Sequence, residues 1–107
     1  MLLTFDVGNT ETTLGLYDGE VLRAHWRIMT DVARTSDEFG VLLRGLLSGS
    51  GVKFGDVDGV AIGSVVPRVT TPLAEACGTW LPATRVEIID ARSPLPITLQ
   101  VDEPLTS

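Results

Sequence analysis

The stretch that decides the fold is residues 6–13, Asp6-Val7-Gly8-Asn9-Thr10-Glu11-Thr12-Thr13. An apolar run at residues 2–7, typical of a buried strand, leads into it, and a patterned run at residues 11–18 leads out. Gly8 and Asn9 both tolerate positive φ, so they predict a tight turn that presents consecutive N–H groups. A plain hairpin turn often has the same pair, and the pair alone does not separate the two interpretations.

Side chains around this turn suit a phosphate with its metal ion. Asp6, at the end of a buried strand, can hold Mg²⁺ directly or through water. Thr10 and either Thr12 or Thr13 offer hydroxyl donors to phosphate oxygens. With the turn amides, these groups would place the β- and γ-phosphates of ATP and neutralise charge during phosphoryl transfer. Residues 6–13 are therefore all candidate ATP-binding residues, and Asp6 is the candidate metal ligand.

The next two strands follow from pattern and turn chemistry. Residues 11–18 carry leucines on one face, and Asp18-Gly19 predicts a hairpin turn of the primed kind. Residues 21–28 alternate as a half-exposed strand does. The inward positions of that strand are expected to be Leu22, Ala24, Trp26 and Ile28, and the outward ones Arg23, His25 and Arg27.

Two helices and two more strands complete the pattern. Thr35 and Glu38 are spaced as a capping box at the start of a helix. Residues 59–66 form an apolar run that fits a central strand covered on both faces. Pro67 suits the first turn of a second helix, and residues 85–89 make a fifth strand. The buried helix stripes are expected to be Phe39, Leu42, Leu43, Leu46 and Leu47, then Val69, Leu73, Ala76, Cys77 and Trp80.

The resulting order, β-β-β-α-β-α-β, predicts an α/β domain. Strands joined by tight turns pair antiparallel, whereas strands that arrive through helical crossovers pair parallel. We expect a mixed five-stranded sheet with helices packed on it, as in one lobe of the ribonuclease-H-like fold of actin-like ATPases. Residues 1–92 would be this phosphate-binding lobe, and residues 93–107 would begin a linker or strand toward a second lobe.

Composition limits the classes of function. With 107 residues, 44% of them hydrophobic, the chain can bury one core without disulfides or metal. The net charge of −6 and the scattered basic residues argue against nucleic acid as a partner, which needs clustered Lys and Arg. No apolar run reaches the ~20 residues of a membrane span. From these two features we expect neither nucleic-acid nor membrane partners. A lone cysteine, Cys77, suits a reducing cytosol, so we expect a cytoplasmic protein.

Several segments, in the same order, resemble the type III pantothenate kinases of bacteria, within the actin-like and sugar-kinase superfamily. That family carries Asp-x-Gly-Asn-Thr on its first hairpin, as at residues 6–10 here. It carries Arg-Thr-Ala-Asp-Glu-Tyr-Gly at its first helix, where residues 34–40 read Arg-Thr-Ser-Asp-Glu-Phe-Gly. The other matches are Trp26-Arg27-Ile28, Ala61-Ile62-Gly63-Ser64-Val65-Val66-Pro67 and Val101-Asp102-Glu103-Pro104.

The resemblance implies an enzyme that phosphorylates pantothenate to 4′-phosphopantothenate with ATP, the first step of coenzyme A biosynthesis. It also implies Mg²⁺ and a monovalent cation, K⁺ or NH₄⁺. The homodimer that it implies has its interface largely in the second lobe, which leaves a monomer open for this chain alone.

A departure from the family lies at the end of the chain. Val101-Asp102-Glu103-Pro104 resembles an Asp-Asn-Pro segment of the family. In the family, that segment is soon followed by Gly-Ala-Asp-Arg, whose Asp resembles a general base. The chain ends at Ser107, where that motif would begin. We therefore expect no catalytic residue in this chain, which would be an N-terminal half, inactive alone, left by a natural truncation or by a cut between domains.

Two other classes of function stay open. The chain could come from a kinase-related accessory transcription factor, or be a non-catalytic interaction domain in which residues 6–13 are only a turn. The single residues with reactive or charged side chains have structural interpretations. These are His25 as a solvated strand residue, Cys77 as core, Ser64 as strand-end packing, and Arg34 and Asp37 as helix-start charges.

Overall fold

A computed structural model describes residues 1–81 and 84–90 of the chain. The described part contains five strands, two α-helices and one 3₁₀ turn, in the order expected from the sequence. Their bounds are Leu2–Val7 (β1), Glu11–Asp18 (β2), Val21–Met29 (β3), Ser36–Gly49 (α1), Phe54–Asp56 (the 3₁₀ turn), Gly59–Ser64 (β4), Pro67–Trp80 (α2) and Arg85–Asp90 (β5). The expected boundary between residues 92 and 93 lies outside the described residues.

The strands form one mixed sheet in the spatial order β3-β2-β1-β4-β5. β1 pairs antiparallel with β2, and β2 with β3, because tight turns join them. β4 pairs parallel with β1, and β5 with β4, because each strand arrives through a helical crossover. The predicted mixed five-stranded sheet is confirmed, and β4 lies inside it rather than at an edge.

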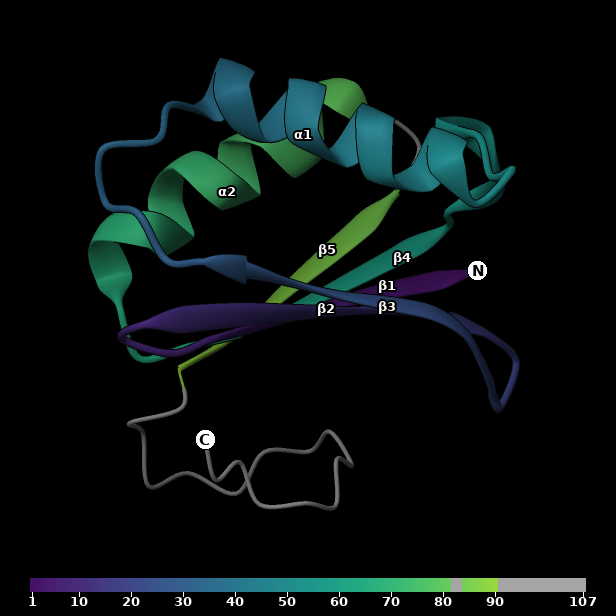
Figure 1. Ribbon diagram of the computed structural model, residues 1–107, viewed down its shortest axis with the longest axis horizontal. Helices are drawn as coiled ribbons and strands as arrows, with labels where there is room; N and C mark the ends of the chain where they lie inside the picture. The colour runs from purple at the N-terminus through teal and green to yellow at the C-terminus, as the bar shows by residue number, and fades with distance from the viewer. Residues whose placement is uncertain (82–83, 91–107) are drawn as a thin grey trace.

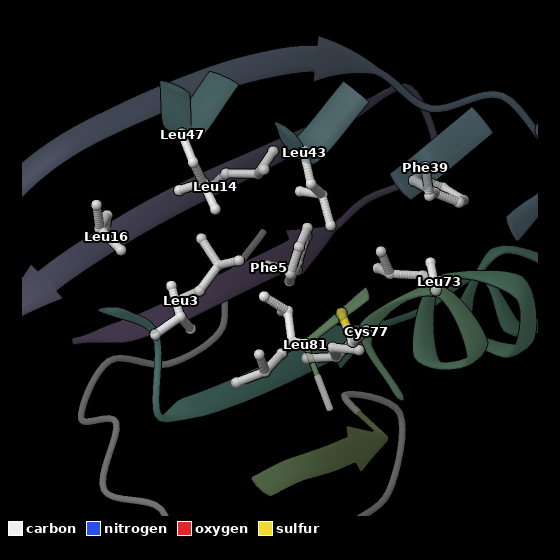
Figure 2. Close-up of a cluster of buried hydrophobic side chains, with 14 of the residues drawn as sticks. Leu3, Phe5, Leu14, Leu16, Phe39, Leu43, Leu47, Leu73, Cys77 and Leu81 are labelled. Carbon is white, nitrogen blue, oxygen red and sulfur yellow. The ribbon is translucent and has the colours of Figure 1, made fainter. Parts of the chain in front are cut away.

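Both helices lie on the same side of the sheet (Figure 1). The side chains that face them form one apolar core, in which Phe5 of β1 lies among residues of α1 and α2 (Figure 2). On β4 only alternate residues are buried, and Gly59, Ala61 and Gly63 are half-exposed in the described structure. The prediction that this strand is covered on both faces is therefore wrong for the described residues, because their helices cover one face only.

The β2–β3 hairpin turns through Gly19 and Glu20, between the paired residues Asp18 and Val21. Gly19 has φ +65°, whereas Glu20 has negative φ. A glycine with positive φ at the first central position is typical of a type II′ turn. The predicted primed hairpin turn is confirmed, with Gly19 as its first central residue.

A β-bulge follows this turn in β3. The register shifts between Leu16 and Tyr17, so that Leu16 pairs with Ala24 while Tyr17 pairs with Leu22. The one-residue shift moves Leu22 to the sheet face that the helices leave open, where it is 47% exposed. The predicted inward position of Leu22 is therefore wrong, whereas Ala24, Trp26 and Ile28 keep theirs.

Trp80 of α2 packs against Gly40 of α1. A Cβ at Gly40 would come within 2.1 Å of the Trp80 ring, so a side chain there would collide with the indole. The ring also contacts Phe54 edge-on, with 6.0 Å between centroids, and lies below the Arg44 guanidinium. Trp80 is half-buried, which differs from its predicted place in the buried stripe; the fully buried residues of α2 are Val69, Leu73, Ala76 and Cys77.

The predicted capping box begins α1. Thr35 Oγ1 accepts from the Glu38 N–H at 3.1 Å, and Glu38 Oε1 accepts from the Thr35 N–H at 2.8 Å. These bonds satisfy two donors at the helix start and fix where the chain enters the helical layer. In the part of the chain described, neither helix combines the length and the apolar character that a membrane span requires.

Candidate phosphate-binding turn

The β1–β2 turn lies at the carboxyl end of two parallel strands. Val7 of β1 pairs with Ser64 of β4, and the Val65 N–H donates to the Val7 carbonyl at 3.1 Å. Figure 1 shows the turn and the start of α2 at the same end of the sheet. Ligands of α/β proteins gather at this end, outside the carboxyl ends of the strands.

The turn runs from Gly8 to Glu11, with Asn9 and Thr10 at its centre. The Gly8 N–H donates to the Glu11 carbonyl at 3.0 Å. Among the described residues only two glycines elsewhere have positive φ, so the prediction that positive φ tightens the turn at Gly8 and Asn9 is wrong. Gly8 suits the turn for another reason, since a Cβ there would lie 3.2 Å from the Glu11 carbonyl oxygen.

Two N–H groups of the turn are open to a ligand. Asn9 and Thr10 are exposed, and the described structure gives neither amide a hydrogen-bond acceptor on the backbone. The Gly8 amide is committed to Glu11. The consecutive amides that can face a phosphate are therefore those of Asn9 and Thr10.

Asp6 is exposed on the open face of the sheet. Thr13 of β2 and Gly63 of β4 are its neighbours in the ladder. Within the described residues, no Lys or Arg lies within salt-bridge distance of Asp6, and no three potential metal ligands cluster. One accessible carboxylate, completed by water and phosphate oxygens, is a donor set that fits Mg²⁺.

Three threonines lie in the turn or directly after it in β2, and they differ in exposure to solvent. Thr10 and Thr13 are exposed, whereas Thr12 is 3% exposed. Thr12 Oγ1 lies 2.8 Å from Thr30 Oγ1, so its hydroxyl is used inside the protein. Thr13 shares the open face with Asp6. Of the two alternatives that the sequence leaves for a second hydroxyl, the geometry favours Thr13.

Val7 and Glu11 contribute to the turn itself. The Val7 side chain is 1% exposed and belongs to the core. The Glu11 carboxylate lies 3.6 Å from Arg27 Nε on the solvent-exposed ladder. The Val7 side chain is out of reach of a ligand because it is buried, and the Glu11 carboxylate would repel a phosphate. Any contact of these two residues with ATP would therefore use backbone atoms.

Thr30, directly after β3, is a residue of this site that the sequence motifs do not indicate. Its N–H donates to the Thr10 carbonyl, and its hydroxyl donates to the Gly8 carbonyl, both at 2.8 Å. Strand register is the signal that points to it, because β3 ends beside the start of β2. If the pairing continued without a bulge from the pair Asp18–Val21 at the Gly19 turn, Met29 would lie opposite Thr10. The one-residue bulge in β3 places Thr30 there instead.

The remaining single residues have the structural roles expected of them. Cys77 is fully buried, and burial raises the pKa of its thiol to about 12, so it stays protonated within the core. The Ser64 hydroxyl is 2.9 Å from the Val66 N–H and 3.2 Å from the Val66 carbonyl, a local turn at the strand end. His25 is exposed, and Arg34 lies over the Phe39 ring beside the start of α1.

Comparison with known proteins identifies relatives over most of the chain. A family model described as type III pantothenate kinase matches residues 2–107. The type III pantothenate kinase of Anaeromyxobacter sp. (strain K) is 53% identical over 77 residues, which cover 72% of this chain and 30% of the relative. That of Streptomyces avermitilis is 51% identical over 94 residues, covering 81% and 36%. The chain thus spans about a third of the length of these curated relatives.

A solved structure supports the fold. The Putative N-acetylglucosamine Kinase from Porphyromonas gingivalis is similar with a TM-score of 0.61 and 22% identity, over 82% of this chain and 33% of that protein. At this identity the likeness concerns the fold alone, and it agrees with the ribonuclease-H-like arrangement of the sheet. With the family match over residues 2–107, the conclusion is that the chain belongs to the type III pantothenate kinase family.

Proposed function

We propose that this chain supplies the ATP-phosphate-binding part of an enzyme that converts ATP and pantothenate to ADP and 4′-phosphopantothenate. One observation carries the proposal. At residues 6–10, an exposed carboxylate at the end of β1, without a cationic partner among the described residues, precedes two exposed residues with consecutive free amides in the turn. Either feature alone also occurs on exposed hairpins that bind nothing. The support comes from finding both at the carboxyl ends of two parallel strands, where ligands of α/β proteins gather.

Each accessible residue has a separate role in this proposal. The amides of Asn9 and Thr10, with the Thr10 hydroxyl, donate to oxygens of the β- and γ-phosphates. Asp6 holds Mg²⁺, which neutralises phosphate charge when it is bound. Thr13 is on the same face as Asp6 and donates to a phosphate oxygen or to water beside the carboxylate. Positioning of this kind is the main source of catalysis in phosphoryl transfer.

The rest of the reaction is proposed for residues outside this chain. Pantothenate as substrate, the general base, the monovalent cation and the homodimer are parts of the proposal taken from the family. The proposed cytoplasmic location rests on the lone cysteine. A general base typically contributes ~10²–10⁴-fold to the rate. We therefore propose that the 107-residue chain binds Mg·ATP weakly and does not turn over pantothenate by itself.

Replacing Asp6 tests the proposal directly. Asp6→Asn should weaken Mg·ATP binding by about tenfold, measured by isothermal titration calorimetry, because the metal loses its protein ligand. With EDTA in place of Mg²⁺, the variant should bind ATP at least as tightly as wild type, because a carboxylate without its metal ion only repels the phosphates. Asp18→Asn is the matched control, since Asp18 is also exposed at a strand end but lies at the other end of β2. Equal losses in the two variants, or no binding by wild type, would contradict the proposal.

A further inference from the structure

Thr30 donates hydrogen bonds to the carbonyls of Gly8 and Thr10, on the two sides of the candidate phosphate-binding turn. We infer that Thr30 is a positioning residue, which orients the Asn9 amide toward a bound phosphate. The inference rests on the proposed function and extends it, since it names what keeps the turn ready to bind. Neither the motifs in the sequence nor the composition of the turn points to this residue.

The side-chain hydrogen bonds run in a single direction. Thr30 Oγ1 must donate to the Gly8 carbonyl, 2.8 Å away, because a carbonyl oxygen can only accept. The hydroxyl has one proton, so in its 2.8 Å contact with Thr12 Oγ1 it accepts and Thr12 donates. Thr12 is 3% exposed, which limits competition from water. The resulting chain from Thr12 through Thr30 to Gly8 is one in which each bond polarises the next.

The Gly8 carbonyl and the Asn9 N–H belong to one peptide unit. In a planar trans peptide these two groups point in opposite directions. A bond that holds the Gly8 oxygen toward Thr30 therefore directs the Asn9 N–H away from Thr30, and Asn9 is exposed. Polarisation of the same peptide unit also makes its N–H a stronger donor. Thr30 thus sets the direction and the strength of one amide that is open to phosphate.

The main chain of Thr30 holds the other side of the turn. Its N–H donates to the Thr10 carbonyl at 2.8 Å. Two carbonyl oxygens, those of Gly8 and Thr10, are consequently held by one residue, and neither is free to turn toward an anion that it would repel. The turn then offers N–H donors to the ligand from a backbone that is fixed before binding, which lowers the cost of ordering it.

Three variants separate positioning from general stability. Thr30→Val removes the hydroxyl and keeps the shape of the side chain, whereas Thr30→Ser keeps the hydroxyl. Thr84→Val is the matched control. Thr84 is also half-buried, and its Oγ1 donates to the Val57 carbonyl at 2.7 Å, before β5 and away from the turn. The two valine variants each remove one threonine-to-carbonyl bond. Thr30→Val also leaves the buried Thr12 hydroxyl without its acceptor, so it should lower stability more than Thr84→Val does.

The expected results concern the 107-residue chain. Without ligand, Thr30→Val should shift the ¹³C resonance of the Gly8 carbonyl and the ¹⁵N resonance of Asn9. It should weaken Mg·ATP binding about fivefold, the effect of one hydrogen bond. Thr30→Ser should keep the wild-type resonances of Gly8 and Asn9 and the wild-type affinity for Mg·ATP. Thr84→Val should change neither the resonances nor the affinity.

Other results would overturn the inference. Gly8 and Asn9 resonances that ignore Thr30→Val would do so, as would equal losses of Mg·ATP binding in the two valine variants. If wild type does not bind Mg·ATP, the proposed function fails, while the resonances still decide whether Thr30 orients the amide. If Thr30→Val does not fold, Thr12→Val tests the same chain one step earlier. It should weaken binding about twofold, and unchanged binding and resonances would count against the inference.

Discussion

The turns at the two ends of β2 close hairpins of the same sheet by different means. The β2–β3 turn uses Gly19 at φ +65°, and its backbone twist matches that of the flanking strands. Local sequence is sufficient for such a turn. The β1–β2 turn contains no residue with positive φ, so it cannot be of the primed kind that fits a hairpin.

The β1–β2 turn instead receives support from a third strand. Thr30, directly after β3, bonds the carbonyls of Gly8 and Thr10. The turn has one hydrogen bond of its own, from the Gly8 N–H to the Glu11 carbonyl, and Thr30 adds two bonds from outside it. The comparison therefore separates a turn that joins two strands from one that also presents amides.

The largest effect on stability should come from Gly40, outside both turns, where α1 packs against Trp80 of α2. Gly40→Ala places a Cβ in the Trp80 ring and should lower the free energy of unfolding by about 1–3 kcal/mol, as overpacking does. Gly45→Ala is the control in the same helix, because a Cβ there meets nothing within 4 Å. It should stabilise the chain by about 0.5–1 kcal/mol through helix propensity. Chemical denaturation measures both, and equal effects would contradict the described helix contact.

Replacing the glycine of either turn should lower stability less than Gly40→Ala does. The two replacements should also differ, because one lowers mainly stability and the other mainly Mg·ATP binding. Gly19→Ala forces a side chain into the left-handed region and should cost about 1–2 kcal/mol of stability without changing Mg·ATP binding. Gly8→Ala needs only a small shift of the Glu11 carbonyl, so it should cost less than about 1 kcal/mol yet weaken Mg·ATP binding. If Gly19→Ala also weakened binding, the two turns would not be distinct in function.

Much of the fold could be predicted from the sequence because its signals are local. The capping box at Thr35 and the glycine turn at Gly19 each depend on a few adjacent residues, and both are confirmed. The position of Leu22 could not be predicted, since a bulge is decided by the pairing of two strands. The contact of Gly40 with Trp80 likewise joins two helices that are distant in sequence.

The candidate site divides in the same way. The motif at residues 6–10 locates the turn, and the exposure of Asp6, Asn9 and Thr10 is compatible with the expected roles, which stay predictions. Strand alternation alone places Thr12 on the face of Leu14 and Leu16, and Thr13 on the other face. The sequence does not show that Thr30 bonds both sides of the turn. That contact depends on the register of three strands, and the bulge in β3 shifts this register by one residue.

The central claim is that one of these turns binds the phosphates of ATP and the other does not. ¹⁵N-resolved NMR of the 107-residue chain, titrated with Mg·ATP, tests it in a single molecule. The account predicts that the Asn9 and Thr10 amides shift downfield and saturate together as they donate to phosphate oxygens, while Gly19 and Glu20 do not move. Shifts of equal size at both turns, or shifts elsewhere with Asn9 and Thr10 unchanged, would contradict it.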